Sequence, residues 1–186
     1  MKIDDGIVRH IKLWDLPSAF DIVVATLSDP YPSAGRLTLV ADSDSWSYYW
    51  NGMGEDVDLA KFIQISPMDY LIDKLGNGVQ KTIISEDDEI ICEFLKGLVL
   101  KARRADKCSS GQARAALDEL DLKYQNLYNL ALNGDLLVVE MMDDNAYFIK
   151  WPEQVNIEYW RLEKALTFLK EALSSLEKKN GVENGN

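Results

Sequence analysis

Residues 36 to 50 read RLTLVADSDSWSYYW, and this stretch decides the fold of the N-terminal part of the chain. From Leu37 to Ala41 apolar residues recur at every second position of RLTLVAD, which is the period of a β-strand with one buried face. Residues 42–45 have the composition of a turn, and the aromatic run 46–50 follows at once. The segment therefore predicts an antiparallel β-hairpin.

The aromatic run WSYYW allows two interpretations. In an extended strand Trp46, Tyr48 and Trp50 lie on one face, opposite the leucines of the preceding strand. Three large rings on one face are typical of a sheet packed beneath helices. If one or two rings stay exposed, they could instead anchor a partner, because Trp and Tyr dominate the energetics of protein interfaces. Both interpretations stay open at this point.

The remaining elements predict an α+β protein. Strand patterns at 8–16 and 20–27 precede a Pro- and Gly-rich turn at 29–36, so we expect an N-terminal antiparallel sheet of three to four strands. We expect the sheet to pack against four to five helices, including a long amphipathic C-terminal helix. Expected helices are near 59–63, 67–75, 86–104, 111–132 and 157–179.

We expect this organisation to form one domain over residues 1–180. Its β-rich half covers residues 1–54 and its helical half residues 55–180, followed by a disordered tail at 181–186. Hydrophobic residues make up 47% of the 186, enough for a core without disulfides or metals. Cys92 and Cys108 are too few for a disulfide framework, so a reducing cytoplasm fits best.

Charge and hydropathy limit the possible partners. The net charge of −11 repels the phosphates of nucleic acids, so we expect no direct nucleic-acid binding. No apolar stretch approaches the roughly 20 residues that cross a bilayer, so we expect no membrane association. An acidic surface fits a protein partner with a basic surface, although acidity alone also serves solubility.

The sequence offers no catalytic constellation. His10 is the only histidine, it lies within a predicted strand, and no nucleophile motif such as GxSxG is present. The acidic run EDDE at 86–89 follows Ser85, a predicted N-cap, and its four side chains would point in different directions from a helix. We interpret these acids as complementing the helix dipole. We therefore expect no enzyme activity, no metal and no cofactor.

The candidate partner-binding surface is the aromatic hairpin with the acids around it. Gly52 and Gly54 allow a sharp turn directly after the rings, and the nearby charges are acidic. The set consists of Trp46, Tyr48, Tyr49, Trp50, Asn51, Met53, Asp42, Asp44, Glu55 and Asp56.

The last helix suggests a different kind of contact. Its apolar residues recur at three- and four-residue spacings between Tyr159 and Leu176, as in a heptad seam. A self-association surface would consist of Leu162, Leu166, Leu169 and Leu173. The seam is short for an independent coiled coil, so docking onto the body of the protein is the other possibility, and a homodimer remains open.

Three segments together resemble a family of small phage- and prophage-encoded proteins. They are SDSWSYYWNGMG at 43–54, KFIQISPMDYLIDKL at 61–75 and YFIKWPEQVNIEYWRLEKAL at 147–166. The family pattern W-x-x-[YW]-W-x-x-M-G matches from Trp46 to Gly54, and the likeness extends from Met1 to about Leu173. Ile157 and Pro67 depart from the pattern. The resemblance also implies that 136–142 is helical rather than extended.

What the resemblance implies is a biological context. Small acidic phage proteins often bind a host protein, including nucleases of restriction or CRISPR systems. The leading hypothesis is therefore a non-enzymatic accessory protein in the host bacterial cytoplasm that binds and inhibits such a protein. A self-associating assembly protein and an enzyme of unrecognised type are the alternatives.

Overall fold

The structure is a computed structural model that describes residues 8–17, 20–31, 33–142 and 149–183. Its contacts divide the chain into two compact units. Unit 1 comprises residues 1–81 and 156–186, and unit 2 comprises residues 82–155. We expected one domain that changes from strands to helices at residue 54. The chain instead leaves unit 1 after residue 81, completes unit 2, and returns to unit 1 at residue 156.

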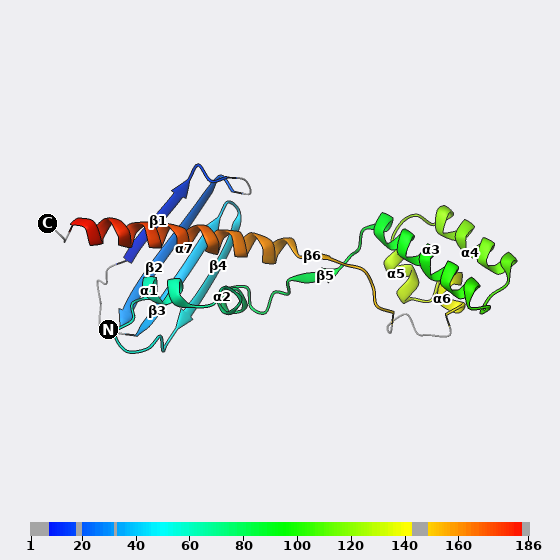
Figure 1. Cartoon of the computed structure of the whole chain (residues 1–186), viewed down its shortest axis with the longest axis horizontal. Helices are drawn as coiled ribbons and strands as arrows, with labels where there is room; N and C mark the ends of the chain where they lie inside the picture. Colours follow the sequence, from blue (N-terminus) through cyan, green and yellow to red (C-terminus); the bar gives the residue numbers. More distant parts are fainter. Residues whose placement is uncertain (1–7, 18–19, 32, 143–148, 184–186) are drawn as a thin grey trace, which may run out of the picture. The chain divides into compact units, whose positions relative to one another are not determined.

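Unit 1 contains the expected antiparallel sheet, which confirms the α+β class. Its strands follow one another in space in the order β1-β2-β3-β4 (Figure 1). They are β1 (Val8–Trp14), β2 (Ile22–Tyr31), β3 (Ala34–Ala41) and β4 (Asp44–Trp50). The β3–β4 turn is shorter than expected, because Ala41 pairs with Asp44. Asp42 adopts a φ of 51° in this turn, and its carboxylate accepts a hydrogen bond of 3.1 Å from the N–H of Asp21.

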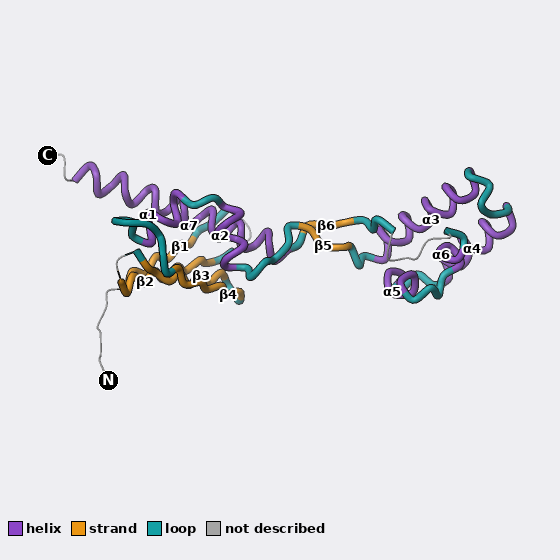
Figure 2. The backbone as a smooth tube through the Cα atoms, turned by 90° about the horizontal axis from the view of Figure 1, so that it is seen from below, coloured by secondary structure: helices purple, strands orange, loops and turns teal. Residues whose placement is uncertain are grey.

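Helices α1 (Leu59–Ile65), α2 (Met68–Leu75) and α7 (Ile157–Glu183) cover one face of this sheet (Figure 2). Alternate residues of the strands, such as Leu37 and Leu39, meet helical residues such as Ile63 and Leu71 in one apolar core. Helix α7 contacts both α1 and α2. The helix continues to Glu183, so the expected tail is helical at 181–183, and residues 184–186 lie outside the described part.

The leucines proposed for self-association belong to the core of unit 1. Leu162, Leu166 and Leu169 are fully buried, and Leu173 is 1% exposed. Helix α7 therefore docks onto the body of the protein, which was the alternative to a self-association seam. A second copy of the chain could reach these side chains only if α7 left the sheet and exposed its apolar stripe to water.

A single arginine links α7 to the β3–β4 hairpin. The Nη2 of Arg161 lies 3.6 Å from a carboxylate oxygen of Asp42, and its Nε donates to Asp44. The guanidinium carbon also lies 4.7 Å from the centroid of the Phe20 ring, a cation–π geometry. These groups are only partly exposed, so the ion pair adds to the buried leucines in holding α7 against the hairpin.

Unit 2 has an apolar core of its own, so the helices of the middle segment pack against one another. The fully buried Ile91, Leu95, Leu120 and Leu127 lie at its centre. The chain enters and leaves unit 2 through the antiparallel pair β5–β6. Its elements are β5 (Thr82–Ile84), α3 (Asp88–Arg104), α4 (Ser110–Leu122), α5 (Leu127–Leu132), α6 (Leu137–Glu140) and β6 (Glu153–Val155).

The acidic run of α3 has structural roles in this unit. Asp87, rather than Ser85, caps the helix by accepting from the N–H groups of Glu89 and Ile90. The carboxylate of Asp88 accepts from the N–H groups of Asn126 and Leu127, at 3.0 and 2.9 Å. Asn126 has a left-handed backbone with a φ of 59°. The helix expected over 111–132 is therefore broken into α4 and α5.

Replacing Leu166 by alanine should destabilise unit 1. The change removes a fully buried side chain, so we expect a loss of about 2–5 kcal/mol in the free energy of unfolding, measured by urea denaturation. The matched control is Leu100→Ala on α3, at a side chain that is 47% exposed, which should cost less than about 1 kcal/mol. Loss of an oligomer at unchanged stability would instead support the self-association seam.

Replacing Arg161 by methionine should cost about 1–2 kcal/mol, because two partly exposed carboxylates lose their counter-ion. Added salt should weaken the wild-type protein more than the variant, since the ion pair is screened. Lys74→Met is the control, since its pair with Asp73 is a surface contact worth close to nothing. Equal effects of the two changes would contradict a role for Arg161 in holding α7.

Candidate functional site

Two of the four rings of the expected partner surface, Trp46 and Trp50, are buried. Trp46 is 7% exposed, Trp50 is 4% exposed and Met53 is 7% exposed, and all three belong to the core of unit 1. The indole N–H of Trp50 donates to the hydroxyl of Tyr70 at 3.1 Å, so its polar atom is also satisfied within the unit. Tyr48 is half-buried against the same core. Trp46, Trp50 and Met53 are therefore unavailable as anchors in this conformation, and Tyr48 is only partly accessible.

The expected acids do not form one patch around the rings. Asp42 lies in the β3–β4 turn and Asp44 begins β4, and both are held by Arg161. Glu55 and Asp56 come after the other end of this strand, which lies about 20 Å from Asp44 at ~3.4 Å per residue. Glu55, Asp56 and Asn51 are exposed. The candidate set is thus divided between the core, an internal ion pair and a separate loop.

The second face of the sheet is covered by no described element of unit 1. Figure 2 shows α1, α2 and α7 on the same side of β1–β4. Residues of this face alternate with the buried ones along each strand, and the strand register places them in rows across the sheet. We call this set the open face: Val8, His10, Lys12, Trp14, Ile22, Val24, Thr26, Ser28, Arg36, Thr38, Val40, Ser45, Ser47 and Tyr49.

Two aromatic rings lie at opposite corners of the open face. Trp14 ends the edge strand β1 and is 66% exposed, whereas Tyr49 lies on the other edge strand, β4, and is 38% exposed. Arg36 is the cross-strand partner of Tyr49, and its guanidinium carbon lies 5.7 Å from the ring centroid. Tyr49 is the one ring of the expected surface that points away from the core.

A polar row crosses the middle of the open face. His10 pairs with Thr26, Thr26 with Thr38, and Thr38 with Ser47. The Nδ1 of His10 lies 3.1 Å from the Thr26 hydroxyl, and the hydroxyls of Thr38 and Ser47 are 3.0 Å apart. These groups present donors and acceptors on a rigid sheet, which suits recognition of polar groups on a partner.

The charges of the open face are cationic, in contrast to the net charge of −11 of the chain. Lys12 and Arg36 lie on it, and no residue of the open face is acidic. Within the described part of the chain no ion pair involves either of these two residues. Their charges therefore remain available to groups outside this protein.

Trp14 and Arg36 are absent from the site predicted from the sequence. The available signal was the alternation of residues 8–16, which places Trp14 on the same face as His10 and Lys12. A tryptophan on the polar face of an edge strand is unusual, because such faces are solvated. The dense run at 46–50 drew attention instead, although its tryptophans serve the core.

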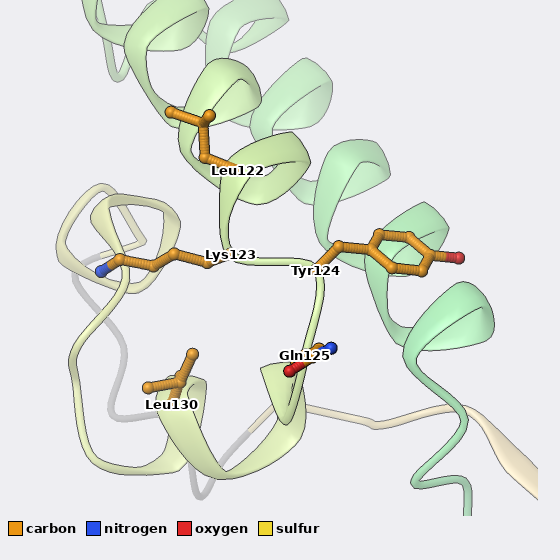
Figure 3. Close-up of a pocket in the computed structure, with 5 residues that line it drawn as sticks. All are labelled: Leu122, Lys123, Tyr124, Gln125 and Leu130. Carbon is orange, nitrogen blue, oxygen red and sulfur yellow. The ribbon is translucent and has the colours of Figure 1, made fainter.

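Unit 2 contains an open depression at the break between α4 and α5 (Figure 3). Its volume is about 530 Å³, and it is lined by Leu122, Lys123, Tyr124, Gln125 and Leu130. Lys123 and Tyr124 point in opposite directions (Figure 3), and the Lys123 ammonium is bound to Glu119 at 3.0 Å. Loss of hydration raises the pKa of Tyr124, and the nearby Glu89 adds to the rise. The polar groups therefore do not converge on a ligand.

The described residues contain no cluster of three or more His, Cys, Asp or Glu side chains arranged to hold a metal. Of the helices within this described part, none combines the length and apolarity that a bilayer span requires.

Comparison with known proteins identifies a family. Residues 1–175 match the model of a family described as a phage family. No curated protein and no solved structure matches the chain. The match extends through both units and reaches into helix α7, and it confirms the resemblance to phage-encoded proteins drawn from the motifs. This chain belongs to that phage family.

Proposed function

We propose that the protein is a non-enzymatic phage accessory protein that binds a host protein through the open face and modulates it. The observation that carries the proposal is the pair of exposed rings, Trp14 and Tyr49, on a sheet face that unit 1 leaves uncovered. Trp, Tyr and Arg are the residue types most enriched at binding hot spots, and all three occur on this face.

The dimensions of the open face suit a protein partner. Its corners, Trp14 and Tyr49, are about 25 Å apart for strands spaced ~4.8 Å and residues rising ~3.4 Å. A standard protein interface buries about 800 Å² per partner, which corresponds to a patch about 30 Å across. Cross-strand contacts already order part of the open face, because Arg36 lies over the Tyr49 ring and the hydroxyls of Thr38 and Ser47 are 3.0 Å apart, and this lowers the entropic cost of binding.

The family context supports the choice of a host partner. We propose that the protein acts in the cytoplasm of the host bacterium and inhibits its partner, with restriction and CRISPR nucleases as the first class to test. A partner with a basic surface remains a prediction for the exposed loop that contains Glu55 and Asp56. It does not suit the open face, because that face carries only basic charges.

The test is affinity capture from a bacterial host lysate by the full chain and by variants of the open face. Trp14→Ser combined with Tyr49→Ser should reduce the amount of captured protein about tenfold or more, because hot-spot rings contribute most of the binding energy. Leu122→Ser is the matched control, since this side chain is 87% exposed but lies on α4 of unit 2. It should capture as much as the wild type.

The possible results separate the claims. If the wild-type chain captures no host protein in stoichiometric amount, the proposed function is wrong. If the double variant captures as well as the wild type, the partner binds elsewhere. The activity of a captured nuclease, measured with and without the protein, then decides whether binding inhibits it.

A further inference from the structure

We propose that the partner presents an acidic protein surface to the open face, so that its carboxylates pair with Lys12 and Arg36. Trp14 and Tyr49 then provide apolar contacts at the corners, and the polar row hydrogen-bonds to the groups between them. This inference rests on the proposed function and specifies its partner.

The charge distribution is the first argument. The chain carries 31 acidic and 20 basic residues, and several of its cations are bound internally. Arg161 pairs with two aspartates, Lys96 with Asp121 at 2.9 Å, and Arg103 with Asp106 at 3.2 Å. Lys12 and Arg36 form no such pair within the described residues. Two unpaired cations on a face without acids complement an anionic surface.

The arrangement of these cations is the second argument. Lys12 lies on β1 and Arg36 on β3, about 17 Å apart by the strand and residue spacings, with the polar row between them. Carboxylates on a partner surface can meet both cations at once while hydroxyl groups fill the space between. The cation–π contact with Tyr49 holds the Arg36 guanidinium over the face, which lowers the cost of ordering it.

A second copy of the chain is a poor occupant of this face. In a two-fold symmetric dimer the same patch meets itself, so the cations of each copy would find no carboxylate on the open face of the other and would add to its positive charge. Like charges brought together in an interface cost several kcal/mol. A homodimer formed through the open face is therefore unfavourable.

Single-stranded nucleic acid is also a poor occupant. It needs a continuous basic groove with rings spaced for successive bases. The face residues of the central strands β2 and β3 include no aromatic side chain, and the two corner rings are about 25 Å apart. The chain's net charge of −11 further repels an extended polyanion.

The test is a titration of the full ¹⁵N-labelled chain, followed by NMR at low salt. The probes are a short glutamate-rich peptide, a lysine-rich peptide of equal length and an oligothymidine. The acidic peptide should shift the indole N–H of Trp14 and the amides around Lys12 and Arg36, whereas the lysine-rich peptide should not. Added salt should weaken the binding.

Charge-reversal variants make the test specific. Lys12→Glu combined with Arg36→Glu should weaken binding of the acidic peptide about tenfold or more. Lys101→Glu combined with Arg104→Glu reverses two exposed cations of α3 and should leave peptide binding at the open face unchanged. Circular dichroism verifies that each variant is folded.

Three results would overturn the inference. They are shifts confined to other surfaces, equal binding by the charge-reversed open face, or tighter binding of oligothymidine at this face. If the acidic peptide fails while Trp14 and Tyr49 remain essential for capture of a host protein, the partner's charge is wrong but the proposed function stands. If capture also fails, both are wrong.

Discussion

The burial of the α7 leucines against the sheet is the contact on which the rest of the structure depends. Helix α7 is encoded after unit 2, so the core of unit 1 is complete only when the chain returns at residue 156. Unit 2 can be inserted in the sequence between α2 and α7 because its two ends, β5 and β6, pair with each other. A fully buried apolar stripe is also the reason that the helix is no free zipper, since exposing Leu162, Leu166 and Leu169 to water would cost several kcal/mol.

The two faces of the sheet have different roles because alternate residues of each strand point to opposite sides. One face takes the fully buried apolar residues of the strands, such as Leu37 and Leu39, and is covered by α1, α2 and α7. The other keeps hydroxyl groups, two cations and the rings of Trp14 and Tyr49. Arg161 neutralises acids at the end of the sheet from the helical side. The cations of the open face therefore remain free for another molecule, which connects the fold to the proposed binding function.

The strands and most helices could be predicted from the sequence, because their periods depend on residues close to one another. The predictions that failed did so because of contacts between residues that are far apart in the sequence. The helix at 111–132 breaks because Asp88, nearly 40 positions away, accepts from the N–H groups of Asn126 and Leu127. Asp42 and Asp44 looked like a free acidic patch, but Arg161 lies more than 100 residues further along the chain. No local pattern contains such partners.

By itself the sequence determined the α+β class, an N-terminal antiparallel sheet of three to four strands, the long final helix and the resemblance to phage proteins. These follow from local periodicity and from motifs that are read along the chain. Only the tertiary structure decided that unit 2 is separate, that Trp46 and Trp50 are buried, and that Trp14, Lys12 and Arg36 share an uncovered face. The physical reason is that alternation divides a strand into two faces without saying which face the helices cover. That choice belongs to the packing of α1, α2 and α7.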